Sequence, residues 1–171
     1  MIVVETGEGL SNAQSYVSVE EATVYHTAFG NSAWTERADQ QEVSLVKATQ
    51  AIDAVWGMMY GSRKKTRAQA LLFPRLGFYD NNGDYVEADE IPRCLKTAVC
   101  EMALQYITQG TDPLENDVDS GIKRKKQKVG DLEEEIEFDG TAQVKSVKEK
   151  NSRVNFLLQP ILRQPSFGIT L

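Results

Sequence analysis

The sequence predicts a mainly α fold, a small helical bundle of three to four helices with a short β-hairpin insertion and an extended C-terminal arm. Apolar residues recur at helical spacing in two long segments, one before residue 60 and one after residue 92. Between them, Asn82-Gly83 lies among aromatic and β-branched residues, which is a strong hairpin signal. A chain of 171 residues can bury one core without a metal or disulfides, so a single domain is expected.

The first helix is expected over residues 19–29, after an extended, turn-rich lead-in at 1–18. Ser18 and Glu21 have the spacing of a capping box, in which each side chain bonds the backbone N–H of the other residue. Gly30 can adopt the left-handed conformation that ends a helix. These signals bound the helix at both ends.

The second helix begins after Thr35 or Asp39 and is the one best supported by periodicity. Its apolar face consists of Leu45, Ala48, Ile52, Val55, Trp56 and Met59. A basic, polar loop follows at 62–67, and Pro74 ends any regular element in the apolar stretch after it. Non-helical chain therefore interrupts the bundle here.

A hairpin is expected over residues 77–86, because Asn82-Gly83 accepts positive φ. The third helix starts near Pro92, where the preceding acidic residues favour the positive end of the helix dipole. Its apolar stripe consists of Leu95, Ala98, Val99, Met102, Tyr106 and Ile107. Residues 1–110 thus form the predicted helical body with its lead-in.

The rest of the chain divides into a charged segment, 111–150, and a C-terminal docking arm, 151–171. The basic run 123–128 and the acidic run 133–138 predict a hairpin or a pair of extended segments of opposite charge. The arm is apolar and broken by prolines, so it is expected to lack a helix and to cover its own core or insert into a neighbouring subunit. The candidate docking residues are Phe156, Leu157, Leu158, Ile161, Leu162, Phe167, Ile169 and Leu171.

No catalytic, cofactor or metal site is predicted, and the chain is not expected to be an enzyme. His26 is the single histidine and has no cysteine or acidic residue at a metal-ligand spacing. Cys94 and Cys100 lack Cys-x-x-Cys spacing and point in different directions on a predicted helix. Phosphate-loop, dinucleotide-binding and nucleophile-elbow motifs are absent from the sequence. No apolar run approaches the roughly 18 residues of a membrane span, so no membrane partner is expected.

Two basic groups are candidate contacts to a polyanion or a partner. They comprise Arg63, Lys64, Lys65 and Arg67 in the first loop, and Lys123, Arg124, Lys125, Lys126 and Lys128 in the charged segment. With Phe78, Tyr79 and Tyr85 nearby, the surface combines positive charge with aromatic rings that can stack on the bases of a single strand. A solvated loop is the alternative, because the formal charge of −6 disfavours general attraction to nucleic acid.

Several short segments resemble a family of tailed-bacteriophage head-tail connector adaptor (neck) proteins. These segments are Tyr16-Val17-Ser18-Val19-Glu20-Glu21-Ala22, Gln69-Ala70-Leu71-Leu72-Phe73-Pro74-Arg75, Glu90-Ile91-Pro92 with Lys96, Ala98 and Glu101, and Lys128-Val129-Gly130. Members of this family often carry the label of a primosomal-type (DnaT-like) single-strand DNA-binding protein. The resemblance covers residues 16–138, and the Phe-Pro-Arg and Ile-Pro segments together are its most distinctive feature.

The resemblance implies a virion structural protein, a head-to-tail adaptor that forms a ring of about a dozen subunits on the portal and extends the DNA channel toward the tail. Its partners would be other copies of the chain, the portal protein, a downstream neck or tail protein, and DNA that passes without specific recognition. The protein would be made in the cytoplasm of the bacterial host and reside in the neck of the virion. The resemblance carries over no catalytic residues and no cofactor.

Two other functions remain open from the sequence. One is a single-strand DNA-binding accessory of replication, which salt-dependent binding of an oligonucleotide would favour. The other is a packaging or chaperone factor that is absent from mature particles, which mass spectrometry of purified particles would reveal.

Overall fold

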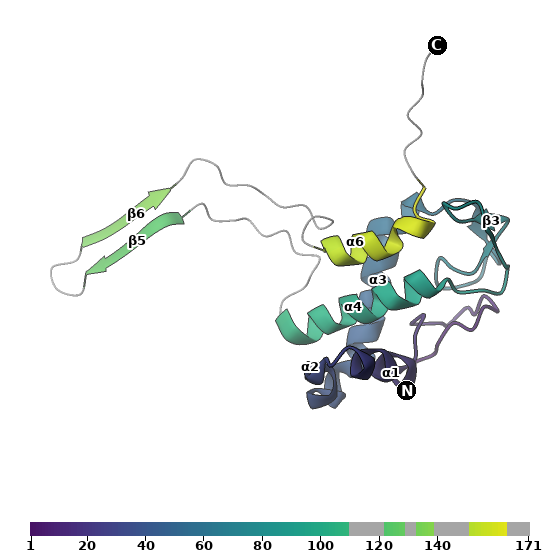
Figure 1. Cartoon of the computed structure of the whole chain (residues 1–171), viewed down its shortest axis with the longest axis horizontal. Helices are drawn as coiled ribbons and strands as arrows, with labels where there is room; N and C mark the ends of the chain where they lie inside the picture. Colours follow the sequence, from purple (N-terminus) through teal and green to yellow (C-terminus); the bar gives the residue numbers. More distant parts are fainter. Residues whose placement is uncertain (110–121, 129–132, 139–150, 164–171) are drawn as a thin grey trace, which may run out of the picture.

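The structure is a computed structural model that describes residues 1–109, 122–128, 133–138 and 151–163, and for 122–128 and 133–138 the backbone alone. It confirms a mainly α fold. Three helices, α3 (Gln41–Trp56), α4 (Arg93–Gln109) and α6 (Ser152–Leu158), form the centre of the helical body. Helices α1 (Val19–Ala28) and α2 (Ser32–Glu36) cover one end of it (Figure 1).

Helix α1 (Val19–Ala28) begins at the predicted capping box. The Ser18 hydroxyl accepts from the Glu21 N–H, and the Glu21 carboxylate accepts from the Ser18 N–H, each at 3.1 Å. The chain then turns at Gly30 and forms the short helix α2 (Ser32–Glu36), which periodicity did not predict because five residues cannot show a helical repeat. Its Trp34 is fully buried, and the indole donates to the Thr23 hydroxyl at 2.9 Å.

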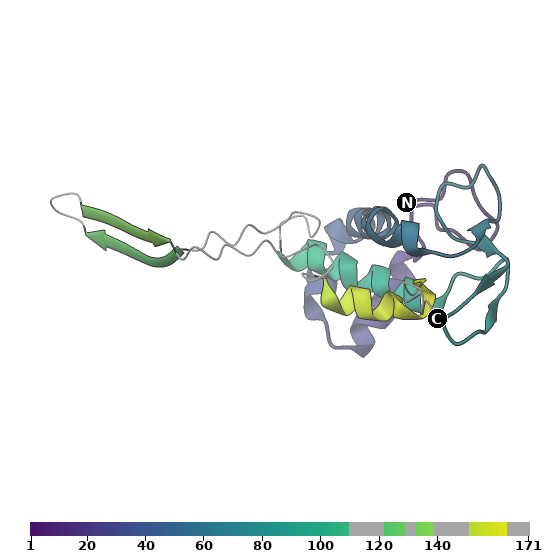
Figure 2. The same ribbon diagram turned by 90° about the horizontal axis from the view of Figure 1, so that it is seen from above.

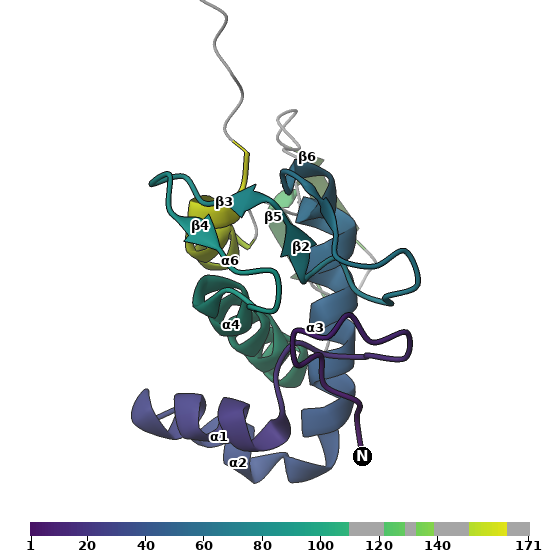
Figure 3. The ribbon, with the colours of Figure 1, turned by 90° about the vertical axis from the view of Figure 1, so that its right-hand side faces the viewer.

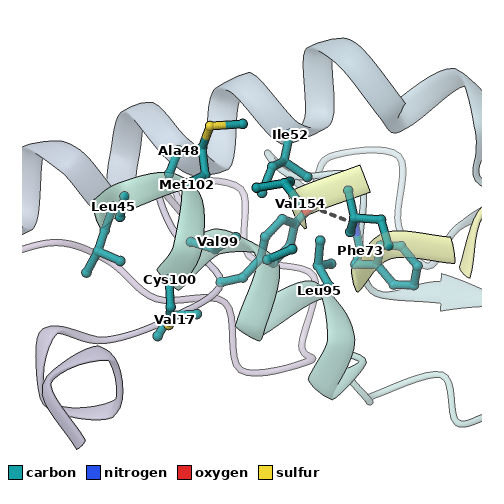
Figure 4. Close-up of a cluster of buried hydrophobic side chains, with 14 of the residues drawn as sticks. Val17, Leu45, Ala48, Ile52, Phe73, Leu95, Val99, Cys100, Met102 and Val154 are labelled. Atoms are coloured by element: carbon teal, nitrogen blue, oxygen red, sulfur yellow. Dashed lines mark hydrogen bonds between the residues drawn. The ribbon is translucent and has the colours of Figure 1, made fainter. Parts of the chain in front are cut away.

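The core lies where α3, α4 and α6 meet, and apolar packing holds it. Figure 4 shows the labelled side chains that fill it. They include Ala48 and Ile52 of α3, Leu95, Val99 and Met102 of α4, Val154 of α6, and Phe73 from the chain between α3 and α4. Each of these seven side chains is fully buried. Complete burial of a Leu, Ile or Phe side chain contributes about 1.5–3 kcal/mol, so this cluster dominates the stability of the body.

In the described part of the chain, three two-stranded antiparallel pairs accompany the helices. The predicted hairpin is present as β3 (Phe78–Tyr79) and β4 (Tyr85–Val86), with Gly83 at φ +87° in its turn. The pair of β1 (Arg63–Lys64) and β2 (Arg75–Leu76) was not predicted, because two residues of the basic loop pair with residues beyond Pro74. Figure 3 shows β2, β3 and β4 together at one end of the body.

The charged segment contains β5 (Ile122–Lys128) and β6 (Glu133–Phe138), which pair in antiparallel register. This confirms the prediction of a hairpin between the basic and acidic runs. The register places Lys126 opposite Glu135 and Lys128 opposite Glu133, so basic positions on one strand face acidic positions on the other. In Figures 1 and 2 the β5–β6 pair lies apart from the helical body.

The C-terminal segment differs from the predicted extended arm, because residues 152–158 form helix α6 and residues 159–161 a 3-10 turn. Pro160 does not interrupt α6, since it follows the last helical residue and occupies the first turn of the 3-10 segment, where no N–H is needed. Leu158, Ile161 and Leu162 are at most 3% exposed in the core of their own chain. Leu162 also bridges Tyr60, and the Arg163 N–H donates to the Met59 carbonyl at 2.8 Å.

The prediction that this segment docks on another chain is therefore wrong for Leu158, Ile161 and Leu162, whose burial is already complete. The argument for a ring from an apolar terminus that a single subunit cannot bury fails for residues 151–163. Phe156 remains 76% exposed, and Leu157 is half-buried. Three further predicted docking residues, Phe167, Ile169 and Leu171, lie outside the described residues.

Candidate nucleic-acid interface

The described residues contain no group of three or more His, Cys, Asp or Glu side chains that could hold a metal ion. Among them, too, no helix is long and apolar enough to cross a membrane. His26 is fully buried beside Trp34, and its Nδ1 pairs with the Asn31 side-chain amide at 3.1 Å. Burial lowers the pKa of His26 and raises the pKa of the Cys94 and Cys100 thiols to about 11 and about 12. These groups are therefore neutral parts of the packed body.

In the basic loop, the two lysines hydrogen-bond to backbone carbonyls, whereas the two arginines are exposed. Lys64 Nζ donates to the Gln69 carbonyl at 3.2 Å, and Lys65 Nζ donates to the Gly7 carbonyl at 2.9 Å. Arg63 and Arg67 are exposed. Within the predicted cluster, the arginines are thus the better candidates for contact with a polyanion.

Arg75, which the sequence places in the Phe-Pro-Arg segment, is buried and hydrogen-bonds to two loops. Its guanidinium donates to the carbonyls of Gly61 and Ser62, each at 2.6 Å, and of Leu72 at 3.0 Å. Burial lowers the pKa of Arg75. With all three bonds directed to backbone carbonyls, Arg75 fixes the 60–64 loop against the 72–75 loop and thereby shapes the surface above it.

Tyr16 and Asp53 hold the same loop from below. The Tyr16 hydroxyl donates to the Asp53 carboxylate at 2.8 Å and accepts from the N–H groups of Leu72 and Phe73 at 2.9 and 3.1 Å. Asp53 also accepts from the Leu72 N–H at 3.0 Å. Burial raises the pKa of Asp53 to about 6, although these hydrogen bonds oppose the shift. The lead-in, α3 and the loop are joined at this point.

The β3–β4 hairpin, which follows the loop held by Arg75 and Tyr16, carries an exposed pair of aromatic rings. Tyr79 is 62% and Tyr85 47% exposed, and their ring centroids lie 5.2 Å apart in an edge arrangement on the β3–β4 hairpin. Asp80, between the strands, is directed into the turn, where its Oδ1 accepts from the N–H groups of Asn82 and Asp84 at 2.8 and 3.0 Å. Two large apolar surfaces thus face solvent on a fixed hairpin.

A shallow hollow of about 190 Å³ adjoins the pair, and its lining includes Ser62, Tyr79, Asn81 and the exposed Arg163. Asn81 fixes this junction, because its N–H donates to the Pro160 carbonyl at 2.8 Å and its side-chain amide donates to the Leu162 carbonyl at 2.9 Å. We call Tyr79, Tyr85 and Arg163 the aromatic-basic face, and Arg63 is a further exposed arginine in the basic loop.

Sequence reasoning found Arg63, Tyr79 and Tyr85 but missed Arg163, because it treated residues after 151 as a free arm. The pairing of Leu162 with Tyr60 and the hydrogen bonds of Asn81 to the Pro160 and Leu162 carbonyls bring Arg163 to the hairpin. The second predicted basic group, Lys123, Arg124, Lys125, Lys126 and Lys128, lies on β5, where the structure describes the backbone alone.

The structure is a mainly α protein in which two exposed tyrosine rings lie beside a hollow lined by Arg163. The chain belongs to the family described as "Putative DnaT-like ssDNA binding protein", whose model matches residues 1–171. No curated protein and no solved structure matches the chain.

Proposed function

We propose that this protein binds single-stranded DNA through the aromatic-basic face. The observation that carries the proposal is the exposed Tyr79–Tyr85 pair beside the hollow lined by Arg163. Bases of a single strand expose their π faces, and stacking on an aromatic side chain contributes about 1–3 kcal/mol per base regardless of sequence. The description of the family agrees with this activity.

The charges of the face and of the basic loop determine how such binding depends on salt. Arg63 and Arg163 would contact phosphates, whereas Asp84 and the overall charge of −6 oppose a polyanion. Few phosphate contacts give a shallow dependence of affinity on salt, with a slope of about −0.7 for each neutralised phosphate. The expected ligand is therefore an unpaired strand held mainly by stacking, without sequence preference.

The test is fluorescence anisotropy of a labelled oligothymidylate, titrated with the full chain at low and near-physiological salt. The double variant Tyr79→Ala/Tyr85→Ala should weaken binding at least ~10-fold, because two stacking surfaces are lost. The matched control Tyr79→Phe/Tyr85→Phe keeps both rings and should bind as the wild type does. Equal affinity of the wild type and the alanine variant, or equal affinity for duplex and single strand, contradicts the proposal.

A second function, the head-to-tail adaptor in the virion neck, is supported by the resemblance of the 69–75 and 90–92 segments and by exposed apolar residues on the body. Val24 of α1 is 72% exposed and Phe29, the residue after α1, is 60% exposed, as expected for a contact between subunits. In this role the chain would form a ring on the portal, extend the DNA channel and meet a downstream neck or tail protein. An unpaired-strand site is not required for it.

Electron-microscopy class averages of the full chain, alone and mixed with portal protein, test the adaptor role. A ring on the portal supports it, and monomers that do not join the portal contradict it. Truncation after Arg163 is the informative variant for the terminal residues, because it preserves α6. Removal of residues 156–171 would delete Leu158, Ile161 and Leu162 from the core, so a folded product is not expected from that truncation.

A further inference from the structure

We propose that the binding surface continues from the aromatic-basic face along the outer side of α6, where Phe156 supplies a further stacking ring. The ligand class is then a single strand long enough to reach from the Tyr79–Tyr85 pair to Phe156, and shorter oligonucleotides contact the pair alone. This inference rests on the proposed function and specifies the length of its ligand.

The exposed side of α6 and of the turn after it carries different residues from the buried side. Arg153, Phe156, Pro160 and Arg163 are all exposed. The three-residue spacing of Arg153 and Phe156 places them on one side of α6, whereas Pro160 lies in the 3-10 turn and Arg163 follows that turn. Val154, Leu158 and Ile161 occupy the opposite, buried side. Because burial of the inner side already attaches α6 to the body, the outer residues are not needed to hold it there.

The charge of this side suits a phosphate backbone. Residues 151–163 include two arginines and no acidic residue. Arg153 is anchored at the base of the surface, since its Nη2 lies 2.9 Å from the Glu101 carboxylate, which is buried, while the arginine side chain is 61% exposed. The Tyr25 hydroxyl donates to the same carboxylate at 2.6 Å. Glu101 therefore positions Arg153 from below.

Phe156 is the most exposed aromatic side chain among the described residues, at 76%. A phenylalanine this open contributes little to folding, which leaves its ring available for a ligand. The neighbouring Asn155 explains why the ring faces outward, because its side chain accepts from the buried Trp56 indole at 2.9 Å and fixes the rotation of α6.

The aromatic-basic face and the exposed side of α6 are continuous, and together they match the length of a short DNA single strand. Asn81 joins the hairpin to the Pro160 carbonyl, and Arg163 shares its hollow with Tyr79. Phe156 and Arg163 are seven residues apart across the end of α6, the 3-10 turn and two further residues, which corresponds to at most about 16 Å. A stacked strand advances about 3.4 Å per nucleotide, so up to about five nucleotides bridge this interval. With bases on both tyrosines and on Phe156, the full contact requires up to about eight.

The test compares oligothymidylates of about four and about twelve nucleotides on the full chain, a range that spans the site sizes of single-strand-binding domains. Phe156→Ala should weaken binding of the longer strand ~10-fold and leave the shorter strand unchanged. Phe156→Trp should bind the longer strand at least as tightly as the wild type. Val43→Ala is the control for loss of an exposed apolar side chain outside the proposed surface, because Val43 is 56% exposed on α3, and it should change neither affinity.

The possible failures are distinct. If Tyr79→Ala/Tyr85→Ala weakens binding of both strands while Phe156→Ala matches the wild type on the longer one, the extension along α6 is overturned and the proposed function stands. If the wild type binds neither strand, both are overturned. A change in oligomeric state in Phe156→Ala, seen by light scattering without a change in strand affinity, would assign Phe156 to a protein contact and also overturn the inference.

Discussion

The bundle of α3, α4 and α6 and the irregular chain over residues 60–90 lie side by side but are held by different interactions. In the bundle, apolar side chains fill a common core. In the irregular region, buried polar side chains bind distant backbone groups, as Arg75 does at Gly61 and Tyr16 does at Leu72. The bundle supplies most of the stability, whereas the polar contacts fix the shape of the surface that carries Tyr79 and Tyr85.

The lead-in belongs with the irregular region in this comparison. The buried Glu5 carboxylate accepts from the N–H groups of Gly7, Gly9 and Leu10 at 2.8–2.9 Å, so the side chain organises its own loop. Lys65 then ties this loop to the basic loop. The Glu5 carboxylate thus binds backbone groups close to it in the sequence, whereas Tyr16 and Arg75 bind backbone groups that are mostly distant in the sequence.

The largest loss of stability is expected from a cavity in the bundle. Leu95→Ala removes a fully buried side chain between the helices and should lower the free energy of unfolding by about 2–5 kcal/mol. Met58→Ala is the control, because Met58 is 96% exposed and its loss should cost less than about 0.5 kcal/mol. Urea denaturation measures both. Equal, small effects would mean that the bundle is not the main source of stability.

A close backbone approach gives the next effect. An added Cβ on Gly7 would lie 1.8 Å from the Asp89 carbonyl oxygen, and Gly7 also has φ +99°. Gly7→Ala should therefore cost about 3 kcal/mol, from backbone strain together with displacement of the lead-in. Gly30→Ala isolates the strain, because Gly30 has φ +68° with open space around it, and about 1 kcal/mol is expected. Equal losses in thermal unfolding would exclude the close approach.

Removal of one hydroxyl tests the polar junction. Tyr16→Phe keeps the buried ring but leaves the Phe73 N–H without its acceptor and removes one of the donors to Asp53, which keeps the Leu72 N–H, so a loss of about 1–3 kcal/mol is expected. Tyr85→Phe removes an exposed hydroxyl and should be neutral within about 0.5 kcal/mol. Amide hydrogen exchange should show faster exchange at Leu72 and Phe73 in Tyr16→Phe. Unchanged exchange there would refute the role of the hydroxyl.

The smallest effect concerns pH. Burial raises the pKa of Asp53 to about 6, so the folded chain binds this proton more tightly than the unfolded chain. The contribution of Asp53 to stability therefore increases as the pH falls through 6 and is lost as the pH rises above it. His26 acts in the opposite sense, because its pKa is lowered and its protonation disfavours the folded state.

Asp53→Asn separates these two groups. The free energy of unfolding of the wild type minus that of the variant should rise by about 1 kcal/mol between about pH 7.5 and about pH 5, since His26 is common to both proteins. Denaturation series at several pH values give this difference. A constant difference would contradict the raised pKa.

The sequence predicted the bundle better than the irregular region for a physical reason. The faces of α3 and α4 follow from local spacing, as does the capping box at Ser18. The Asn82-Gly83 turn and the β5–β6 hairpin were also predicted from short-range signals. All of these depend on residues close together in the chain.

The roles of Tyr16, Arg75 and Arg163 depend on contacts across long separations, which no local pattern reports. Helix α6 was missed because Pro160 was taken to break it, although the proline follows its last residue. The spacing of Arg153, Phe156 and Pro160 against Val154, Leu158 and Ile161 was the signal that could have revealed both the helix and its exposed side.

Photo-crosslinking of an oligothymidylate of about twelve nucleotides to the full chain, followed by peptide mass spectrometry, tests the central claim most directly, because it locates the strand without a substitution. The binding surface described above predicts crosslinked peptides that contain Tyr79, Tyr85 and Phe156, and only a modest decrease of their yield at high salt, because few phosphate contacts are involved. Crosslinks confined to α1 or to residues 123–128, with none at these three aromatic residues, would contradict it.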